Sequence, residues 1–167
     1  LKTAQKLAQL FVWALRDMQN VTTKVFGHTA NVTKNNDCQV YRLWEPGDPL
    51  SRLGLIATLP HQNNYDGFAI ASVVKEVMER GEPDEQRVVI VLADGYPSGS
   101  GYGSEPAYQH VHMVDDWARK NGVEVIQIAI DSDLDASRQS AMFRNWIGFT
   151  DSASLPRKLE ALLAKLT

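Results

Sequence analysis

The chain contains a single cysteine, Cys38, so no disulfide can form within it. A lone thiol fits a reducing compartment, and we expect a cytoplasmic protein. No apolar run reaches the roughly 18 residues that a membrane-spanning helix needs. The sequence opens on an amphipathic pattern instead of a basic stretch followed by an apolar one, which argues against a secretory signal peptide. We therefore expect no membrane association.

An excess of charge of one sign is also missing. The 17 basic and 20 acidic residues are mixed along the chain and give a formal net charge of −3. This balance offers no electrostatic reason to expect a nucleic-acid partner. The sequence has no repeats, linkers or low-complexity tracts. It has 167 residues, of which 44% are hydrophobic, and we expect one globular domain over residues 1–167.

The spacing of apolar residues alternates between two patterns along the chain. A period of three to four residues predicts helices, and short β-branched runs predict strands. The expected helices are 1–18, 66–80, 106–120 and 154–166, the expected strands are 21–26, 37–44, 87–93, 123–130 and 145–149, and 50–59 fits either. Helices between short apolar strands imply crossover connections. The predicted fold is therefore a doubly wound, mostly parallel α/β sheet with helices on both faces.

A glycine-rich stretch follows the apolar strand 87–93. In a doubly wound sheet the ligand site lies beyond the carboxyl ends of the strands, where Asp94 stands. Gly99, Gly101 and Gly103 have the spacing G-x-G-x-G, not the G-x-G-x-x-G of a dinucleotide loop, and Asp94 would repel a phosphate. A mobile surface loop is the simpler interpretation, and a partner-contacting loop is the alternative.

A divalent cation fits the same end of the sheet better than a phosphate does. Asn64 and Asp66 stand at the start of the predicted helix 66–80, which begins near the same edge as Asp94. Hard cations such as Mg²⁺ take oxygen ligands and keep some waters, so a few Asp and Asn oxygens from separate loops suffice. Simpler roles also remain open, with Asp94 in a strand-end turn and Asp66 as a helix cap.

Other groups of polar residues fit ordinary roles. His110 and His112 are two residues apart and cannot share one helix face, so we expect an exposed pair and no zinc site. Asp131, Asp133 and Asp135 imitate the start of an EF-hand loop, but the later glycine and glutamate are absent, and we expect helix capping. No serine stands in a G-x-S-x-G nucleophile motif.

Two motifs together carry a family resemblance. The stretches "NYDGFAI" (64–70) and "VVIVLADGYP" (88–97) resemble, in order and distance, the von Willebrand factor A fold. Within it they are similar to the cytoplasmic bacterial branch that contains the cobaltochelatase T subunit and the nitric-oxide-reductase activation protein D. The resemblance covers nearly the whole chain. It implies a metal-ion-dependent adhesion site, in which Mg²⁺ is held by a D-x-S-x-S loop, a threonine and an aspartate from three loops.

The resemblance assigns the metal ligands residue by residue. Asp94 matches the aspartate of the third loop, Asn64 stands where the family usually has threonine, and Asp66 is the carboxylate particular to this branch. The D-x-S-x-S loop has no counterpart. In the family it follows the central strand, which lies between the strands that correspond here to 21–26 and 87–93. The resemblance thus implies an N-terminally incomplete domain that lacks its central first strand. Direct pairing of strands 21–26 and 87–93 in one uninterrupted sheet would contradict it.

Protein binding is the function that the resemblance implies. One Mg²⁺ or Mn²⁺ on Asp94, Asn64 and Asp66 would leave a coordination position for a carboxylate of a partner protein. The branch suggests a ring-forming AAA+ ATPase as that partner, in a chelatase-like or protein-remodelling complex. Residues expected to contact the partner are Tyr65, Tyr96, Ser98 and Tyr102.

An enzyme is the alternative that the residues leave open. A nucleotide-binding protein or a metal-assisted phosphohydrolase could use Asp94 at the same strand end. A hydrolase needs a further acid or base close by, and Asp131 or Asp151 could supply one.

Overall fold

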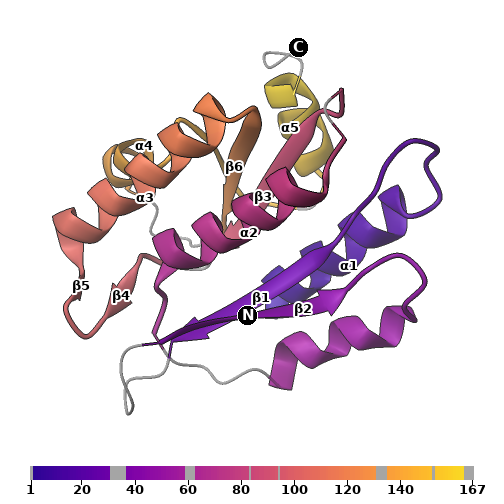
Figure 1. The fold of residues 1–167 in the computed structure, drawn as a ribbon, viewed down its shortest axis with the longest axis horizontal. Helices are drawn as coiled ribbons and strands as arrows, with labels where there is room; N and C mark the ends of the chain where they lie inside the picture. Colours follow the sequence, from indigo (N-terminus) through magenta and orange to yellow (C-terminus); the bar gives the residue numbers. More distant parts are fainter. Residues whose placement is uncertain are drawn as a thin grey trace.

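The computed structural model describes residues 2–30, 37–58, 63–82, 84–93, 95–130, 135–151 and 153–163. Its helices are α1 (Lys2–Leu15), α2 (Asp66–Arg80), α3 (Ser104–Lys120), α4 (Ala136–Met142) and α5 (Leu155–Leu163), with a 3-10 helix η1 (Leu50–Thr58). Its strands are β1 (Val25–Ala30), β2 (Cys38–Trp44), β3 (Arg87–Ala93), β4 (Ser98–Gly99), β5 (Tyr102–Gly103), β6 (Val123–Ala129) and β7 (Asn145–Gly148) (Figure 1). None of the described helices combines the length and the apolar character needed to cross a membrane.

A parallel sheet with the strand order β3–β6–β7 forms the centre of the α/β fold. Arg87 pairs with Val123 and Ala93 with Ala129 in an unshifted register. Helix α3 connects β3 to β6 and α4 connects β6 to β7, which are the crossovers that parallel strands require. The prediction of an α/β fold with helices around a parallel sheet is confirmed at this level.

The side chains of β6 divide between the two faces of this sheet. Val123 and Val125 pack with residues of α2 and α3, whereas Ile128 packs with residues of α1 and α5. Alternation of side chains along a strand explains the division. The sheet therefore lies between two helical layers, with α2 and α3 on one face and α1 and α5 on the other (Figure 1).

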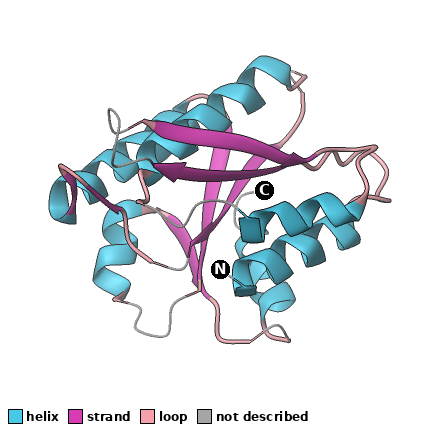
Figure 2. Cartoon of the chain, turned by 90° about the horizontal axis from the view of Figure 1, so that it is seen from below, coloured by secondary structure: helices cyan, strands magenta, loops and turns pink. Residues whose placement is uncertain are grey.

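Strands β1 and β2 form a separate antiparallel hairpin. His28 pairs with Val40 and Ala30 with Cys38, and the register shifts between Val25 and Phe26. In Figure 2 the two long strands of this hairpin run across the direction of the parallel strands. A further core joins the hairpin to α1 and η1, and its buried members are Ala8, Val12, Leu43, Trp44, Leu53 and Ile56.

The position of the first strand differs from the prediction. The sequence predicted a strand at 21–26, but β1 runs from Val25 to Ala30. The chain leaves α1 through a turn in which Asn20 has a φ of 63°, and residues 21–24 are irregular. The segment Gly27–Ala30 has little apolar pattern, and its strand conformation comes from pairing with β2. Within the segment 50–59, for which the sequence allowed a helix or a strand, Leu50–Thr58 form the 3-10 helix η1.

Strands β1 and β3 each keep one open edge within the described part of the chain. β1 pairs with β2, β3 pairs with β6, and no ladder among these residues joins β1 to β3. The apolar sequence of β3 is typical of a central strand that is covered on both faces. Among its residues, however, only Val89 is buried. The carbonyl of Ala93 accepts from Ile130 N at 2.8 Å, so alternate residues such as Ile90 direct their backbone groups to the open edge. The uninterrupted sheet that would contradict the family resemblance is thus not present in these residues.

Candidate functional site

The segment Asn63–Asn64 links distant parts of the fold at the carboxyl ends of the strands. Ala30 N, at the end of β1, donates to the carbonyl of Asn63 at 3.0 Å. Asn64 and Ser98 exchange two backbone hydrogen bonds of 2.8 and 3.1 Å. Asn64 lies two residues before Asp66, the first residue of α2, and Ser98 begins β4 in the segment that follows β3. The backbone therefore brings the two candidate loops into contact.

The glycine-rich stretch after β3 forms a short hairpin instead of an irregular loop. Ser98 pairs with Gly103 and Gly99 with Tyr102, and Gly101 takes a φ of 69° in the turn. The hydroxyl of Tyr65 donates to the carbonyl of Ser100 at 3.0 Å and ties the turn to the start of α2. A Cβ on Gly99 would overlap the Tyr65 ring, so this glycine permits the close approach. Gly99 thus permits close packing against Tyr65, and Gly101 provides the positive φ of the turn.

A hydrogen-bonded chain crosses from α2 to α3 through this hairpin. The backbone N of Gly67 donates to the Tyr102 hydroxyl at 3.1 Å, and that hydroxyl lies 2.9 Å from His110 Nδ1. We assign the Tyr102 proton to the bond with Nδ1, with the neutral His110 ring protonated on Nε2, because the Tyr102 oxygen already accepts from Gly67. Burial raises the pKa of Tyr102 to about 12, so the phenol keeps this proton, and burial lowers the pKa of His110, which favours the neutral ring that accepts it.

Aromatic rings surround this chain. The Tyr65 and Tyr102 centroids are 5.0 Å apart, and Phe68 lies 5.6 Å from Tyr102 and 4.5 Å from His110. Phe68 is 52% exposed, whereas Tyr65 is 4% exposed. Sequence reasoning missed the roles of Phe68 and His110, and the expected exposed pair of histidines is wrong for His110. Tyr102 and His110 are eight residues apart in the sequence, and Gly67 and Tyr102 are thirty-five residues apart. Neither spacing is a sequence pattern that predicts a contact.

Asp66 occupies the first turn of α2 and faces the hairpin β1–β2. It is 9% exposed, and its Oδ1 lies 3.3 Å from His28 Nε2 of β1. The N-cap position belongs to Tyr65, so Asp66 is not the cap that the sequence allowed, although its charge favours the positive end of the helix. Burial and the Asp66 charge raise the pKa of Cys38, which keeps this thiol protonated and unreactive.

The structure describes the surroundings of two of the three predicted metal ligands, Asn64 and Asp66. Asp94 lies outside the described residues. Asn64 is partly buried at the contact between the two loops, and Asp66 is buried beside His28. Within the described ranges no cluster of three or more His, Cys, Asp or Glu residues could hold a metal ion. The oxygen donors of Asn64 and Asp66 nevertheless have the chemistry that Mg²⁺ prefers.

The residues expected to contact a partner are mostly occupied by internal contacts. Tyr65 is buried and therefore packs the hairpin instead of presenting a surface, and Tyr102 is half-buried in the hydrogen-bonded chain. The Tyr96 hydroxyl accepts from Asp135 N at 3.1 Å, and Arg138 lies over the ring. Ser98 has the exposed side chain of this set. The Tyr65 ring fills the space left by Gly99, and its contact with a partner stays a prediction.

Two carboxylates that follow strands have structural partners: Asp135, which was expected to cap a helix, and Asp151, which the enzymatic alternative could use. Asp135 accepts from Ser137 N at 2.9 Å and from Arg138 N at 3.3 Å, which confirms helix capping for this residue at α4. Asp151 accepts from Ser154 N at 2.7 Å, and this bond is the main cause of its lowered pKa. A carboxylate with a lowered pKa is a weak proton acceptor. Asp131 and Asp133 lie outside the described residues.

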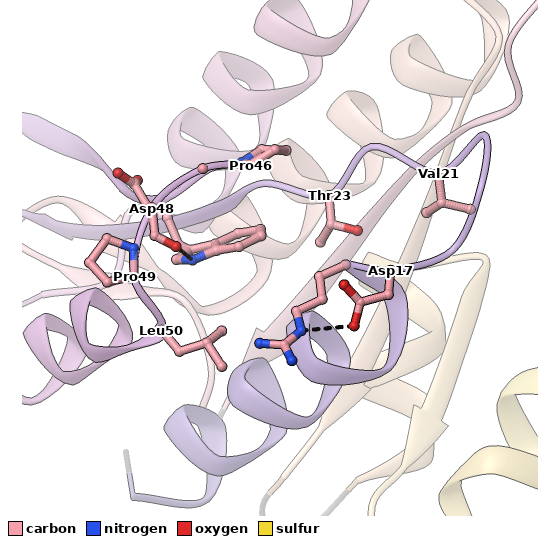
Figure 3. Close-up of a pocket in the computed structure, with 10 residues that line it drawn as sticks. Asp17, Val21, Thr23, Pro46, Asp48, Pro49 and Leu50 are labelled. Atoms are coloured by element: carbon pink, nitrogen blue, oxygen red, sulfur yellow. Dashed lines mark hydrogen bonds and ion pairs between the residues drawn. The ribbon is translucent and has the colours of Figure 1, made fainter.

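A shallow pocket of about 350 Å³ lies at the opposite end of β1 (Figure 3). It is formed by the end of α1, the segment before β1 and the turn after β2. The indole of Trp44 donates to the carbonyl of Asp48 at 3.0 Å, and Arg16 Nε lies 3.1 Å from Asp17. These polar groups are already paired. The pocket shares no residue with the Asn64–Ser98 contact.

The partly buried histidine beside Asp66, His28, predicts a loss of stability in mild acid. Burial lowers the pKa of His28 from its ordinary value of 6.5, even though Asp66 lies beside Nε2. A lowered folded-state pKa means that the unfolded chain binds the proton more readily. The stabilisation is therefore complete above about pH 6.5 and is lost as the pH falls through the folded-state pKa.

Urea unfolding over this range measures the effect, with His28→Gln as the comparison. The glutamine amide keeps a donor towards Asp66 but does not titrate. We expect the variant to lose less stability than the wild type as the pH falls. Equal losses in both proteins would show that His28 is not the source.

Comparison with known proteins adds one similarity. No protein-family model matches the chain. Over 112 residues it is 32% identical to "Uncharacterized protein YojO" of Bacillus subtilis (strain 168), and the match covers 64% of this chain and 17% of that protein. The chain is thus similar to a segment of a much longer protein, whose name states no activity.

Proposed function

We propose that this chain carries a von Willebrand factor A-like domain that binds one Mg²⁺ or Mn²⁺ at the carboxyl ends of its strands. Through this ion it binds a carboxylate of a partner protein. The observation that carries the proposal is the pair of backbone hydrogen bonds between Asn64 and Ser98. These bonds bring together the loop before α2 and the loop after β3, which both contain candidate ligands.

The ligands differ in how they would act. Asn64 stands at the contact between the loops, and Asp94 follows β3 directly in the sequence, so these two would hold the ion. Asp66 already lies 3.3 Å from His28 Nε2, so it would not bind the ion directly. It would instead accept a hydrogen bond from a water bound to the ion. The ion supplies an open coordination position for an incoming carboxylate. The function is binding, because no bond needs to be made or broken.

The open edges of β1 and β3 support the same family assignment. The two edges lack a strand between them in the described residues, and the apolar side chains of β3 remain partly exposed there. An additional strand on the open edge of β3 would pair with its free backbone groups and bury these side chains. In the proposed family this element is the central strand, and the D-x-S-x-S loop at its end would complete the ligand set.

The proposed partner is a ring-forming AAA+ ATPase in the cytoplasm, in a chelatase-like or protein-remodelling complex. This part follows from the resemblance of the motifs at 64–70 and 88–97. Ser98 and Phe68 have exposed side chains near the proposed ion and would contact the partner. A partner carboxylate next to an apolar side chain fits this pair of contacts.

Titration of Mn²⁺, followed by calorimetry or by its paramagnetic resonance, tests the cation site. We expect binding in the wild type and an affinity at least about tenfold lower in Asp94→Ala and in Asn64→Ala. The matched control is Asp84→Ala, an exposed carboxylate outside the two loops, which should leave the affinity unchanged. Absence of binding in the wild type, or equal binding in all four proteins, would refute the proposal.

A further inference from the structure

The contact between hairpin β4–β5 and the first turn of α2 depends on one titratable side chain. With the neutral His110 ring protonated on Nε2, Nδ1 of this residue of α3 accepts the proton of the Tyr102 hydroxyl, and the Tyr102 oxygen accepts from the backbone N of Gly67. The distances are 2.9 and 3.1 Å. Three elements, α2, β5 and α3, therefore meet in a single line of hydrogen bonds.

His110 and Tyr102 pack closely against the backbone of Gly67. A Cβ on Gly67 would lie 2.5 Å from His110 Nδ1 and 2.7 Å from the Tyr102 hydroxyl. The two side chains thus press directly against the backbone of α2. The Phe68 and His110 ring centroids lie 4.5 Å apart, with the ring planes tilted by 58°. A rotation of the imidazole would therefore change this contact as well as the hydrogen bond.

Protonation of His110 removes the acceptor on which this series of hydrogen bonds depends. A neutral ring offers Nδ1 as an acceptor, but an imidazolium carries a proton on both nitrogens. The Tyr102 hydroxyl would then face a donor while it still accepts from Gly67, and its own proton would have no acceptor. The other titratable groups that face this line are Asp66 of α2 and Cys38 of β2, and both act on Tyr102.

We infer that Tyr102 and His110 form a proton-sensitive latch, which holds hairpin β4–β5 on the first turn of α2 when His110 is neutral and releases it when His110 is protonated. Release loosens the contact between Asn64 and Ser98, because Ser98 belongs to the same hairpin. If these loops hold the proposed cation, the latch also sets their spacing, and that consequence alone rests on the proposed function.

Hydrogen exchange of the Gly67 amide, measured without added cation, tests the latch itself. Protection factors, which correct for the intrinsic pH dependence of exchange, are compared between about pH 5 and about pH 8. In the wild type we expect protection to fall about five- to tenfold towards the acid end, as the loss of one hydrogen bond would give. Tyr102→Phe should show the low value at every pH.

The matched variant is His110→Asn, whose Oδ1 accepts near the place of Nδ1 but does not titrate. Its Gly67 amide should stay protected across the whole range. Wild-type protection in Tyr102→Phe, or an acid-induced loss that persists in His110→Asn, would overturn the inference. Circular dichroism confirms that both variants are folded. A latch that works in a protein without cation binding would refute the proposed function and leave the latch intact.

Discussion

Leu53→Ala is expected to destabilise the chain by about 3 kcal/mol, the largest effect that we predict for a single side chain. Leu53 is 0% exposed and lies in η1, between α1 and strand β2. Its neighbours in this core include Val12 and Trp44. Truncation removes apolar contacts and leaves a cavity. The surrounding elements relax only partly into such a cavity, so its cost adds to that of the lost contacts.

The same helix provides the control. Leu55 is 44% exposed, and Leu55→Ala should change the free energy of unfolding by no more than about 0.5 kcal/mol. Both substitutions remove the same atoms from the same 3-10 helix, so helix propensity cancels in the comparison. Urea unfolding curves give both values. Similar losses for the two variants would mean that η1 does not pack as described.

Gly99→Ala is expected to cost about 2 to 3 kcal/mol through overpacking. The added methyl group would overlap the ring of Tyr65, which is buried and tied to Ser100 by its hydroxyl. Relief of the overlap requires the hairpin β4–β5 to move away from α2. The expected result is therefore a lower stability together with a displaced hairpin.

Gly95→Ala is the matched substitution, because a Cβ at Gly95 meets nothing within 4 Å. Neither position requires a positive φ, so the two variants differ in crowding and not in backbone strain. We expect Gly95→Ala to lie within about 0.5 kcal/mol of the wild type. Thermal or urea unfolding measures both. A larger loss for Gly95→Ala than for Gly99→Ala would contradict the described packing at Tyr65.

Elements with a complete local pattern could be predicted from the sequence. Helix α2 has both predicted ends, Asp66 and Arg80, because its apolar face is regular and Gly81 follows it. Strand β3 likewise has its predicted ends, since its apolar run is bounded by polar residues. Helix α4 (Ala136–Met142) was not predicted, because it is short and mostly polar, and Asp135 at its cap was the only signal.

The candidate site was predicted only where topology alone decides the outcome. The carboxyl ends of strands meet at one edge, so the approach of Asn64 to the loop after β3 followed from the fold. The burial of Tyr65 did not follow, because it depends on Gly99, which is far along the chain. The bond from Tyr102 to His110 likewise joins two elements whose relative placement is tertiary. Packing of this kind has no periodic signature.

The separation of the two sheets has a consequence for the cooperativity of unfolding. The hairpin β1–β2 and the sheet β3–β6–β7 share no ladder among the described residues, so side chains of α1 and α2 supply much of their connection. Interfaces of side chains open more readily than continuous hydrogen-bonded ladders, and proteins unfold locally in such units. The hairpin, with η1, is therefore the unit able to detach first, while the parallel sheet and α3 keep their native structure.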